Sequence, residues 1–337
     1  MDQPLNTAEQ YAERESFPLG ERHLMKILIS FDLDNAYVNR IRSCLESVDI
    51  QMSSDPKTVI SACSDVEVIL AGRFTKEMFT NSAKLRWIQT VSAGVDRFLF
   101  PEFVSSNVLL TNAKGIHFPQ VSDHVLAMIL AFSRRLNKFI RVQSERKWAR
   151  IQCDELQKRT IGIIGLGSIG SEIARKAKCF GMKVVAVDRN SKRSPSCVDK
   201  ILDLSGLHEL LEQSDFVVLS VALTQESDGM IGEKELSTMK RDAVLINVSR
   251  GRVVQEKALI RVLKEGKIGG AGLDVFEEEP LSPASELWLM ENVIITPHVA
   301  GSTPHYWDRV CDIFCENLRR YASGQPLINI VDKKLGY

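Results

Sequence analysis

A glycine-rich segment between a predicted strand and a predicted helix constrains the fold of this chain more than any other feature. Residues 160–164 are mostly apolar and β-branched, and Gly165, Gly167 and Gly170 follow them with Gly-x-Gly-x-x-Gly spacing. A one-sided apolar pattern over 169–180 then indicates a helix. In this context the first glycine permits a tight turn, the second lets the backbone approach a pyrophosphate, and the third lets helix and strand pack closely. The segment therefore predicts a dinucleotide-binding α/β unit.

An acidic residue at the end of the next strand favours NAD over NADP. Asp188 follows the apolar run 183–187, where a carboxylate can bind the adenosine ribose hydroxyls and would repel the 2′-phosphate of NADP. Arg189 could attract that phosphate, so NADP stays open as the less favoured cofactor. The same cofactor site is expected to include Ser168, Ile169, Thr224 and Val248.

Short apolar runs alternate with helical patterns over most of the chain. The predicted strands are 26–30, 66–70, 86–90, 108–111, 160–164, 183–187, 216–221, 243–247, 270–273 and 293–296. Runs this apolar suit parallel strands that are buried on both faces. The alternation predicts an α/β protein with doubly wound, Rossmann-like or flavodoxin-like sheets, and 337 residues are enough for two such domains.

Glycine and proline interrupt the pattern at 111–121 and again at 301–304, which suggests two crossings between domains. We expect a mobile N-terminal extension over 1–24, since this segment is polar and lacks the pattern of a secretion signal. A discontinuous substrate domain would contain 25–118 and 303–337, and the NAD-binding domain would contain 119–302.

Composition argues against several other classes of protein. Lys plus Arg and Asp plus Glu both number 43, so net charge gives no reason to expect a nucleic acid or membrane partner. No apolar run approaches the length of a membrane span. The seven cysteines are odd in number, widely spaced and without a Cys-x-x-Cys, which favours a reducing, cytoplasmic compartment and no metal site.

Three predicted strands end in side chains that could perform chemistry. Arg250 follows 243–247, Glu279 lies beyond the end of 270–273, and His298 follows 293–296. Ligands bind at the carboxyl ends of strands in such sheets. Arg250 offers a guanidinium fork to a carboxylate and a carbonyl, His298 can exchange a proton with an alkoxide, and Glu279 can orient the imidazole. These groups fit hydride transfer between nicotinamide and C2 of a small 2-hydroxy or 2-keto acid.

At these positions the chain resembles the D-isomer-specific 2-hydroxyacid dehydrogenase family, over about residues 25–330. The segments that carry the resemblance are 165–170, 247–251, 272–280 and 296–298. The resemblance implies the same catalytic roles for Arg250, Glu279 and His298. It also implies that Asp274 contacts the nicotinamide amide, and that backbone N–H groups of Ala93 and Gly94 bind the substrate carboxylate in a cleft between the domains.

The resemblance further implies D-stereochemistry, substrates such as glyoxylate, hydroxypyruvate or pyruvate, and a homodimer built through the NAD-binding domains. The apolar helix predicted over 121–136 agrees with a dimer, although it could equally be buried within one subunit. Residues 122–124 and Ala222 depart from the usual family pattern, so the subfamily stays open.

Other functions remain possible at this stage. An NAD(H)-sensing, corepressor-like protein would share the fold, and phosphite or 3-phosphoglycerate oxidation would share the cofactor motif. Glu279 argues against formate oxidation, because that reaction needs no proton transfer to an alkoxide.

Overall fold

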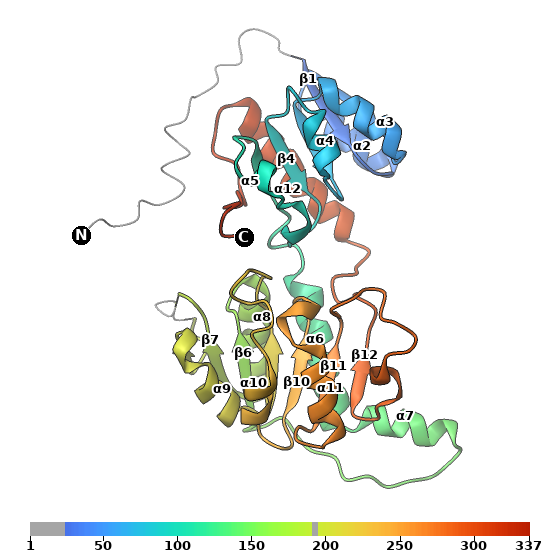
Figure 1. Ribbon diagram of the computed structural model, residues 1–337, viewed down its shortest axis with the longest axis vertical. Helices are drawn as coiled ribbons and strands as arrows, with labels where there is room; N and C mark the ends of the chain where they lie inside the picture. Colours follow the sequence, from blue (N-terminus) through green and yellow to red (C-terminus); the bar gives the residue numbers. More distant parts are fainter. Residues whose placement is uncertain (1–23, 191–194) are drawn as a thin grey trace, which may run out of the picture. The chain divides into compact units, whose positions relative to one another are not determined.

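The computed structural model describes residues 24–190 and 195–337, which fold into two α/β units (Figure 1). The first unit contains the described residues up to Ile116 together with Thr303–Tyr337, and the second is His117–Ser302. The sequence analysis divides the chain after residues 118 and 302, and the structure divides it after 116 and 302. All but the last residue of the predicted N-terminal extension lie outside the described residues.

The first unit is a five-stranded parallel sheet in the order β2-β1-β3-β4-β5. Its strands are β1 (Met25–Ile29), β2 (Val48–Met52), β3 (Val68–Ala71), β4 (Trp87–Thr90) and β5 (Leu109–Thr111). Its helices are α2 (Asn35–Arg42), α3 (Pro56–Ala62), α4 (Lys76–Thr80), α5 (Pro101–Val104) and α12 (Tyr306–Ala322), with 3-10 turns η1 (Cys63–Asp65) and η2 (Asp96–Phe98). This strand order is flavodoxin-like.

The second unit is a seven-stranded parallel sheet in the order β12-β11-β10-β9-β6-β7-β8. Its strands are β6 (Thr160–Ile164), β7 (Lys183–Val187), β8 (Lys200–Leu202), β9 (Phe216–Leu219), β10 (Val244–Asn247), β11 (Gly270–Leu273) and β12 (Val293–Ile295). Its helices are α6 (Phe118–Ser133), α7 (Leu136–Ser144), α8 (Ser168–Cys179), α9 (Leu207–Gln213), α10 (Glu233–Thr238) and α11 (Glu256–Lys264), with 3-10 turns η3 (Leu204–Gly206), η4 (Gly251–Val253) and η5 (Glu286–Leu289). The strand order reverses next to β6, as in a Rossmann fold, so the predicted fold class is confirmed.

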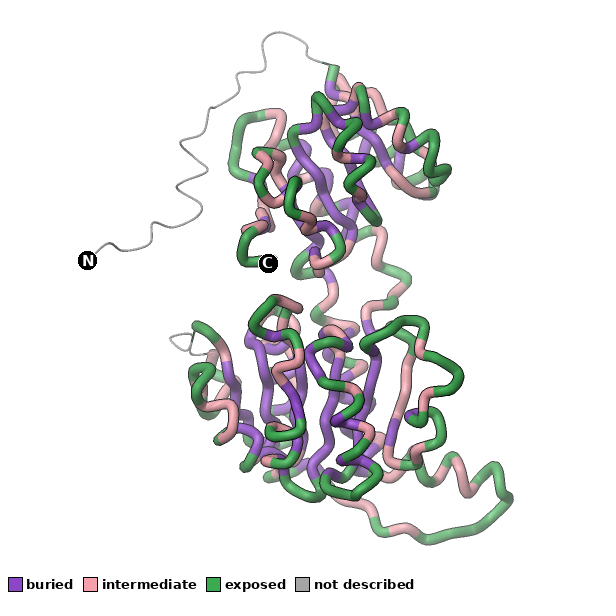
Figure 2. The backbone as a smooth tube through the Cα atoms, in the orientation of Figure 1, coloured by how far each residue is buried: buried purple, intermediate pink, exposed green. Residues whose placement is uncertain are grey.

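Each central strand of the second sheet contributes to two separate cores. In β7, Val184 and Ala186 pack in one hydrophobic cluster, whereas Val185 and Val187 pack in the other. Successive side chains of a strand point to opposite faces, so helices must cover both faces of this sheet. Figure 2 shows the buried residues concentrated in the strands, while the surrounding helices expose their outer faces. This double burial explains why the strand sequences are continuously apolar.

The C-terminal segment is anchored within the first unit by a partly buried lysine. Lys333 Nζ donates hydrogen bonds to the carbonyl oxygens of Phe103 (3.0 Å), Ser106 (2.8 Å) and Val108 (2.8 Å). It also lies 4.7 Å from the centre of the Phe103 ring. Burial lowers the pKa of Lys333 to about 8.

The apolar residues of α6 belong to the interior of the second unit. Val125, Met128, Ile129 and Phe132 are all buried and join the core cluster that contains alternate residues of β6 and β7. Burial within the subunit therefore accounts for these apolar residues of the helix predicted over 121–136, without a dimer contact. It ends earlier than expected, because Arg135 adopts a left-handed conformation with φ of 55° and a new helix, α7, follows.

Candidate functional site

The three glycines of the cofactor motif have different environments. Gly165 has φ of +96°, and a Cβ on Gly170 would lie only 2.0 Å from the Gly165 carbonyl oxygen. A side chain at Gly170 would therefore separate the loop from α8. A Cβ on Gly167 would meet no atom within 4 Å, so this face of the loop is open to a ligand. Helix α8 begins directly after Gly167, which directs its free N–H groups and positive dipole end toward the same region.

Asp188 holds the glycine loop in shape as well as ending β7. Its Oδ2 accepts a hydrogen bond from the backbone N–H of Leu166 at 2.7 Å, and its Oδ1 accepts one from Asn190 at 2.8 Å. Each carboxylate oxygen can accept more than one hydrogen bond, so these contacts still permit binding of ribose hydroxyls. The neighbouring Arg189 forms an ion pair with Glu226, which supplies a competing partner for its guanidinium group.

The structure brings Glu279 and His298 together in the second unit. His298 Nδ1 lies 2.8 Å from Glu279 Oε2, and Glu279 Oε1 accepts a 3.2 Å hydrogen bond from the N–H of Phe276. Because an ionised carboxylate only accepts hydrogen bonds, the contact requires a proton on Nδ1. The His298 side chain is 46% exposed, compared with 24% for Glu279. The imidazole is therefore fixed at one nitrogen by a partly buried acid and remains accessible to solvent.

Asp274 is buried beneath the turn that carries His298. Its Oδ1 accepts hydrogen bonds from Thr296 Oγ1 (2.6 Å) and the N–H of Val299 (2.9 Å), and its Oδ2 accepts from the N–H of Ala300 (2.9 Å). Its backbone oxygen accepts from the N–H of His298 at 2.8 Å. Asp274 therefore shapes the 298–300 turn, a role that sequence reasoning missed. The sequence held a signal for this role: consecutive strands of a parallel sheet commonly pair, as β11 and β12 do, so a residue directly after β11 lies close to the turn after β12.

Arg250 lies on a tight turn after β10 that a buried asparagine organises. Asn247 is 1% exposed; its Nδ2 donates to the carbonyl oxygen of Arg250 and its Oδ1 accepts from the N–H of Ser249, both at 3.0 Å. The Arg250 guanidinium donates to the Ser249 carbonyl oxygen at 2.8 Å. A Cβ on Gly251 would lie 1.8 Å from the backbone carbon of Phe276. Only glycine lets this turn pack against the segment that leads to Glu279.

The remaining predicted cofactor residues of the second unit lie at the start of a helix, after a strand or in a turn. Ser168 is exposed and Ile169 is partly buried at the start of α8, and Val248 is partly buried after β10. Thr224 lies in a turn where its N–H donates to Ser227 Oγ at 2.8 Å.

Ala93 and Gly94 lie in the first unit, in the turn after β4. Ser92 Oγ donates to the Gly94 carbonyl oxygen at 2.7 Å, and Asn112 Nδ2 donates to the Ala93 carbonyl oxygen at 2.8 Å. Among residues 24–190 and 195–337, neither the backbone N–H of Ala93 nor that of Gly94 donates a hydrogen bond. The turn is thus fixed through its carbonyl groups, and two neighbouring N–H groups are left for a ligand.

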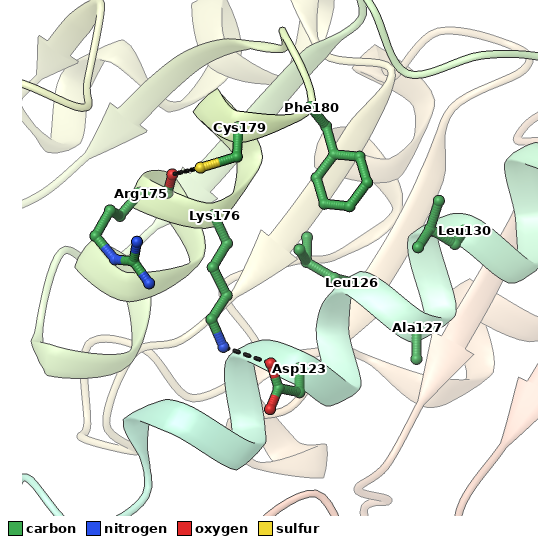
Figure 3. A pocket seen from close by; sticks show the side chains of 8 residues that line it. All are labelled: Asp123, Leu126, Ala127, Leu130, Arg175, Lys176, Cys179 and Phe180. Atoms are coloured by element: carbon green, nitrogen blue, oxygen red, sulfur yellow. Dashed lines mark hydrogen bonds and ion pairs between the residues drawn. The ribbon is translucent and has the colours of Figure 1, made fainter.

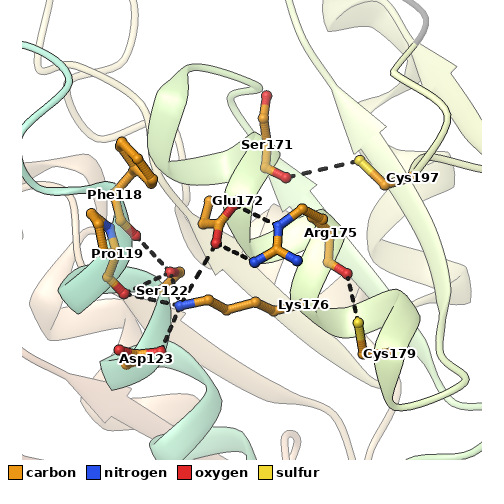
Figure 4. A network of polar contacts seen from close by, with 10 residues as sticks. All are labelled: Phe118, Pro119, Ser122, Asp123, Ser171, Glu172, Arg175, Lys176, Cys179 and Cys197. Carbon is orange, nitrogen blue, oxygen red and sulfur yellow. Dashed lines mark hydrogen bonds and ion pairs between the residues drawn. The ribbon is translucent and has the colours of Figure 1, made fainter.

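Residues 122–123, where the sequence departs from the family pattern, form part of a polar clamp between α6 and α8 (Figure 4). Lys176 Nζ donates to Pro119 O (3.0 Å), Ser122 Oγ (2.7 Å) and Asp123 Oδ1 (2.5 Å). A shallow pocket opens beside this clamp (Figure 3), lined by Asp123, Leu126, Ala127, Leu130, Arg175, Lys176, Cys179 and Phe180. None of these is a predicted site residue, so the clamp is best explained as helix packing.

The described part of the chain, residues 24–190 and 195–337, contains neither a membrane-spanning helix nor a metal-binding cluster. Its helices are all too short or too polar to cross a membrane. Its His, Cys, Asp and Glu side chains form no group of three or more that could hold a metal ion. All seven cysteines are free thiols.

Comparisons with known proteins give a consistent result. Residues 126–300 match the family model described as D-isomer specific 2-hydroxyacid dehydrogenase, NAD binding domain. A glyoxylate reductase from Korarchaeum cryptofilum is 36% identical over 282 residues, which cover 82% of this chain and 85% of that protein.

Two solved structures illustrate the cofactors found among similar proteins. An NADPH-dependent glyoxylate/hydroxypyruvate reductase from Sinorhizobium meliloti, in complex with NADP and sulfate, superimposes with a TM-score of 0.83 and 28% identity, covering 93% of this chain and all of that one. A D-lactate dehydrogenase from Aquifex aeolicus, complexed with NAD and lactic acid, has a TM-score of 0.76 and 28% identity, covering 91% and 99%.

Proposed function

The chain belongs to the D-isomer specific 2-hydroxyacid dehydrogenase family, and we propose that it reduces glyoxylate or a similarly small 2-keto acid at C2 with NADH. As a member of this family it is an NAD(P)-dependent oxidoreductase of small 2-hydroxy and 2-keto acids. The observation that carries the proposal is the 2.8 Å contact between His298 and Glu279 in the same unit as the glycine loop. Similarity to named reductases and dehydrogenases does not favour the corepressor, phosphite or 3-phosphoglycerate alternatives.

The glycine loop fits a dinucleotide on structural grounds. The open face at Gly167 and the N-terminus of α8 suit the pyrophosphate, and Asp188, which follows β7 directly, would bind the adenosine ribose. The bound cofactor would supply the hydride. The family also suggests Asp274 for the nicotinamide amide. Its three accepted hydrogen bonds make support of the His298 turn a second role for the same carboxylate.

His298 is the proton donor in this proposal. When hydride adds to C2, the carbonyl π bond breaks and negative charge develops on the oxygen. The Nε2–H of doubly protonated His298 transfers its proton to that oxygen, giving the alcohol, while Nδ1–H stays bound to Glu279. Glu279 stabilises the cationic imidazole before the transfer and keeps the ring oriented after it.

Arg250 and the N–H groups of Ala93 and Gly94 are the proposed substrate-binding groups. A guanidinium group can bind a carboxylate and polarise the adjacent carbonyl, which lowers the energy of the developing alkoxide. The N–H groups of Ala93 and Gly94 would bind the carboxylate without adding positive charge.

We propose NAD as the preferred cofactor within a family whose structures contain both NAD and NADP. The Asp188 carboxylate would repel a 2′-phosphate. The cation beside it, Arg189, has an anionic partner in Glu226, which reduces its attraction for that phosphate. A comparison of kcat/KM for NADH and NADPH tests this preference directly.

We also propose a homodimer through the NAD-binding units. In α7 and the segment after it, Leu136 is 48% exposed, Ile140 is 66% exposed and Trp148 is 95% exposed. Leu136 and Ile140 are four residues apart on α7 and so share one face of it, and contiguous exposed apolar surface is a feature of protein–protein contact sites. Light scattering should give the mass of two chains, and Trp148→Ser combined with Ile140→Ser should shift it toward one chain.

The experiment that tests the function is a kinetic panel. NADH consumption is followed by its near-ultraviolet absorbance with glyoxylate, hydroxypyruvate, pyruvate and a bulkier 2-keto acid, each in wild type and His298→Ala. We expect turnover with the small acids, and a far greater loss of turnover than of NADH binding in the variant. The proposal would be contradicted if the protein bound NADH and turned over none of these acids, or if His298→Ala lost turnover and NADH binding equally.

A further inference from the structure

The turn that carries His298 is held in an unfavourable backbone conformation. His298 has φ of 54°, in the left-handed region, which costs a non-glycine residue about 1 kcal/mol or more. The turn keeps this shape through four hydrogen bonds to Asp274: the N–H groups of His298, Val299 and Ala300 all donate to it, as does the Thr296 hydroxyl. The placement of the imidazole therefore depends on where the Asp274 carboxylate lies.

A second histidine, His124 on α6, contacts both Thr296 and Asp274. His124 Nε2 lies 3.0 Å from Thr296 Oγ1 and 3.8 Å from Asp274 Oδ1. The side chain of His124 is 21% exposed and that of Asp274 is 2% exposed. Among the residues that the structure describes, His124 is the one group able to carry positive charge within 4.0 Å of this buried carboxylate.

The hydrogen-bond directions in this group can be assigned from valence. The Thr296 hydroxyl has a single proton, and its 2.6 Å contact with Asp274 Oδ1 uses it, because the carboxylate can only accept. Thr296 Oγ1 must then accept from His124, so Nε2 of His124 carries a proton. A histidine protonated only on Nδ1 would instead draw the Thr296 proton away from Asp274.

We propose that His124 is a positioning residue for the reaction. Its Nε2–H fixes the Thr296 hydroxyl toward Asp274, and Asp274 in turn holds His298 in the conformation in which it exchanges its proton. His124 does not touch the reacting atoms in this account. The consequence for the rate rests on the proposed function, whereas the hydrogen-bond arrangement does not.

The test compares variants that keep or remove the donor. His124→Gln can place an amide N–H where Nε2 lies, His124→Leu removes the donor, and Thr296→Val removes the next group. We expect kcat to fall about tenfold in His124→Leu, the scale of one lost hydrogen bond, and to stay within about threefold of wild type in His124→Gln. The NADH dissociation constant should stay within about twofold of wild type in both, since His124 acts on the turn.

A matched control exists elsewhere in the same unit. His208 Nδ1 lies 3.3 Å from Thr238 Oγ1 and its Nε2 lies 3.7 Å from Glu235 Oε1, so the same three kinds of group meet between α9 and α10. His208→Leu should leave kcat unchanged. A double variant of His124→Leu and Thr296→Val should lose no more activity than either single variant, because both break the same chain of contacts.

Hydrogen–deuterium exchange separates this inference from the proposed function. The amides of Val299 and Ala300 donate to Asp274, so they should exchange faster in His124→Leu and at the wild-type rate in His124→Gln, whether or not the protein turns over a keto acid. Equal exchange in wild type and His124→Leu would overturn the proposal. So would additive kcat losses in the double variant, or a His124→Gln variant as slow as His124→Leu. An inactive wild type with the expected exchange pattern would contradict the proposed function alone.

Discussion

The substitution Glu279→Gln tests the proposed chemistry through a single change of charge. The substitution keeps an oxygen that can accept the Nδ1–H of His298, so the ring keeps its orientation and loses its anionic partner. At the observed 2.8 Å separation, Coulomb attraction is worth about 1.5 kcal/mol at the dielectric constant of water and about 6 kcal/mol at an effective value of ~20. His298 is nearly half exposed, so screening places the effect near the lower limit, at about 2–3 kcal/mol. This energy corresponds to a loss of roughly 30- to 150-fold in kcat.

The assay is steady-state NADH consumption with saturating glyoxylate, together with NADH binding followed by fluorescence. Glu278→Gln is the matched control, since it removes the same charge from the adjacent exposed position. We expect a wild-type rate in the control and wild-type NADH affinity in both variants. A loss in Glu279→Gln below about threefold, or an equal loss in Glu278→Gln, would refute the role of Glu279.

Three other predictions concern the cofactor loop and the stability of the first unit. Gly170→Ala should lower the melting temperature and abolish NADH binding, because the new Cβ would lie 2.0 Å from a carbonyl oxygen. Gly167→Ala should keep the melting temperature of wild type and only weaken NADH binding. Calorimetry and NADH titration distinguish the two variants, and equal melting temperatures would contradict the packing argument. Asp188→Ala should narrow the ratio of kcat/KM for NADH over NADPH, and an unchanged ratio would mean that the carboxylate does not face the ribose. The pKa of Lys333 is about 8 in the folded protein, below the unfolded value of about 10.5, so Lys333 binds fewer protons when the protein is folded. The free energy of unfolding of wild type, relative to that of Lys333→Met, should therefore rise as the pH rises between these two values. Denaturant unfolding at several pH values measures this difference, and a difference that stays constant with pH would contradict the prediction.

The central strands of both sheets could be predicted closely from sequence. Each of the ten predicted strands corresponds to a strand of the structure, and 160–164, 183–187 and 270–273 have the predicted bounds. Eight of these ten strands lie inside their sheets, where burial on both faces leaves a continuous apolar run that is easily recognised.

The two strands that sequence analysis missed are edge strands. β2 has the sequence Val-Asp-Ile-Gln-Met and β8 has Lys-Ile-Leu, and neither contains a fully buried residue. An edge strand has one neighbour and one covered face, so its composition approaches that of a loop. Parallel pairing with β1 and β7 stabilises them, and that pairing is a property of the folded sheet.

The candidate site was predictable in its residue types and not in its supporting contacts. Strand-end logic selects Arg250, Glu279 and His298 because a parallel sheet brings its carboxyl ends to one edge. The contact between His124 and Thr296 joins residues 172 positions apart, and no local pattern encodes it. For α6 the sequence left two alternatives open, a dimer contact and burial within the subunit, because apolar periodicity shows that a helix face is buried and does not show what buries it.

The proposed transfer of hydride to C2 can be followed with an isotope label. The wild-type protein would be incubated with glyoxylate and NADH in which both C4 hydrogens of the nicotinamide are deuterium, and the product examined by mass spectrometry and proton NMR. We expect wild type to form glycolate with one deuterium at C2, and His298→Ala to form far less of it. Glycolate without deuterium, or deuterium transfer that persists unchanged in His298→Ala, would contradict hydride transfer assisted by this histidine.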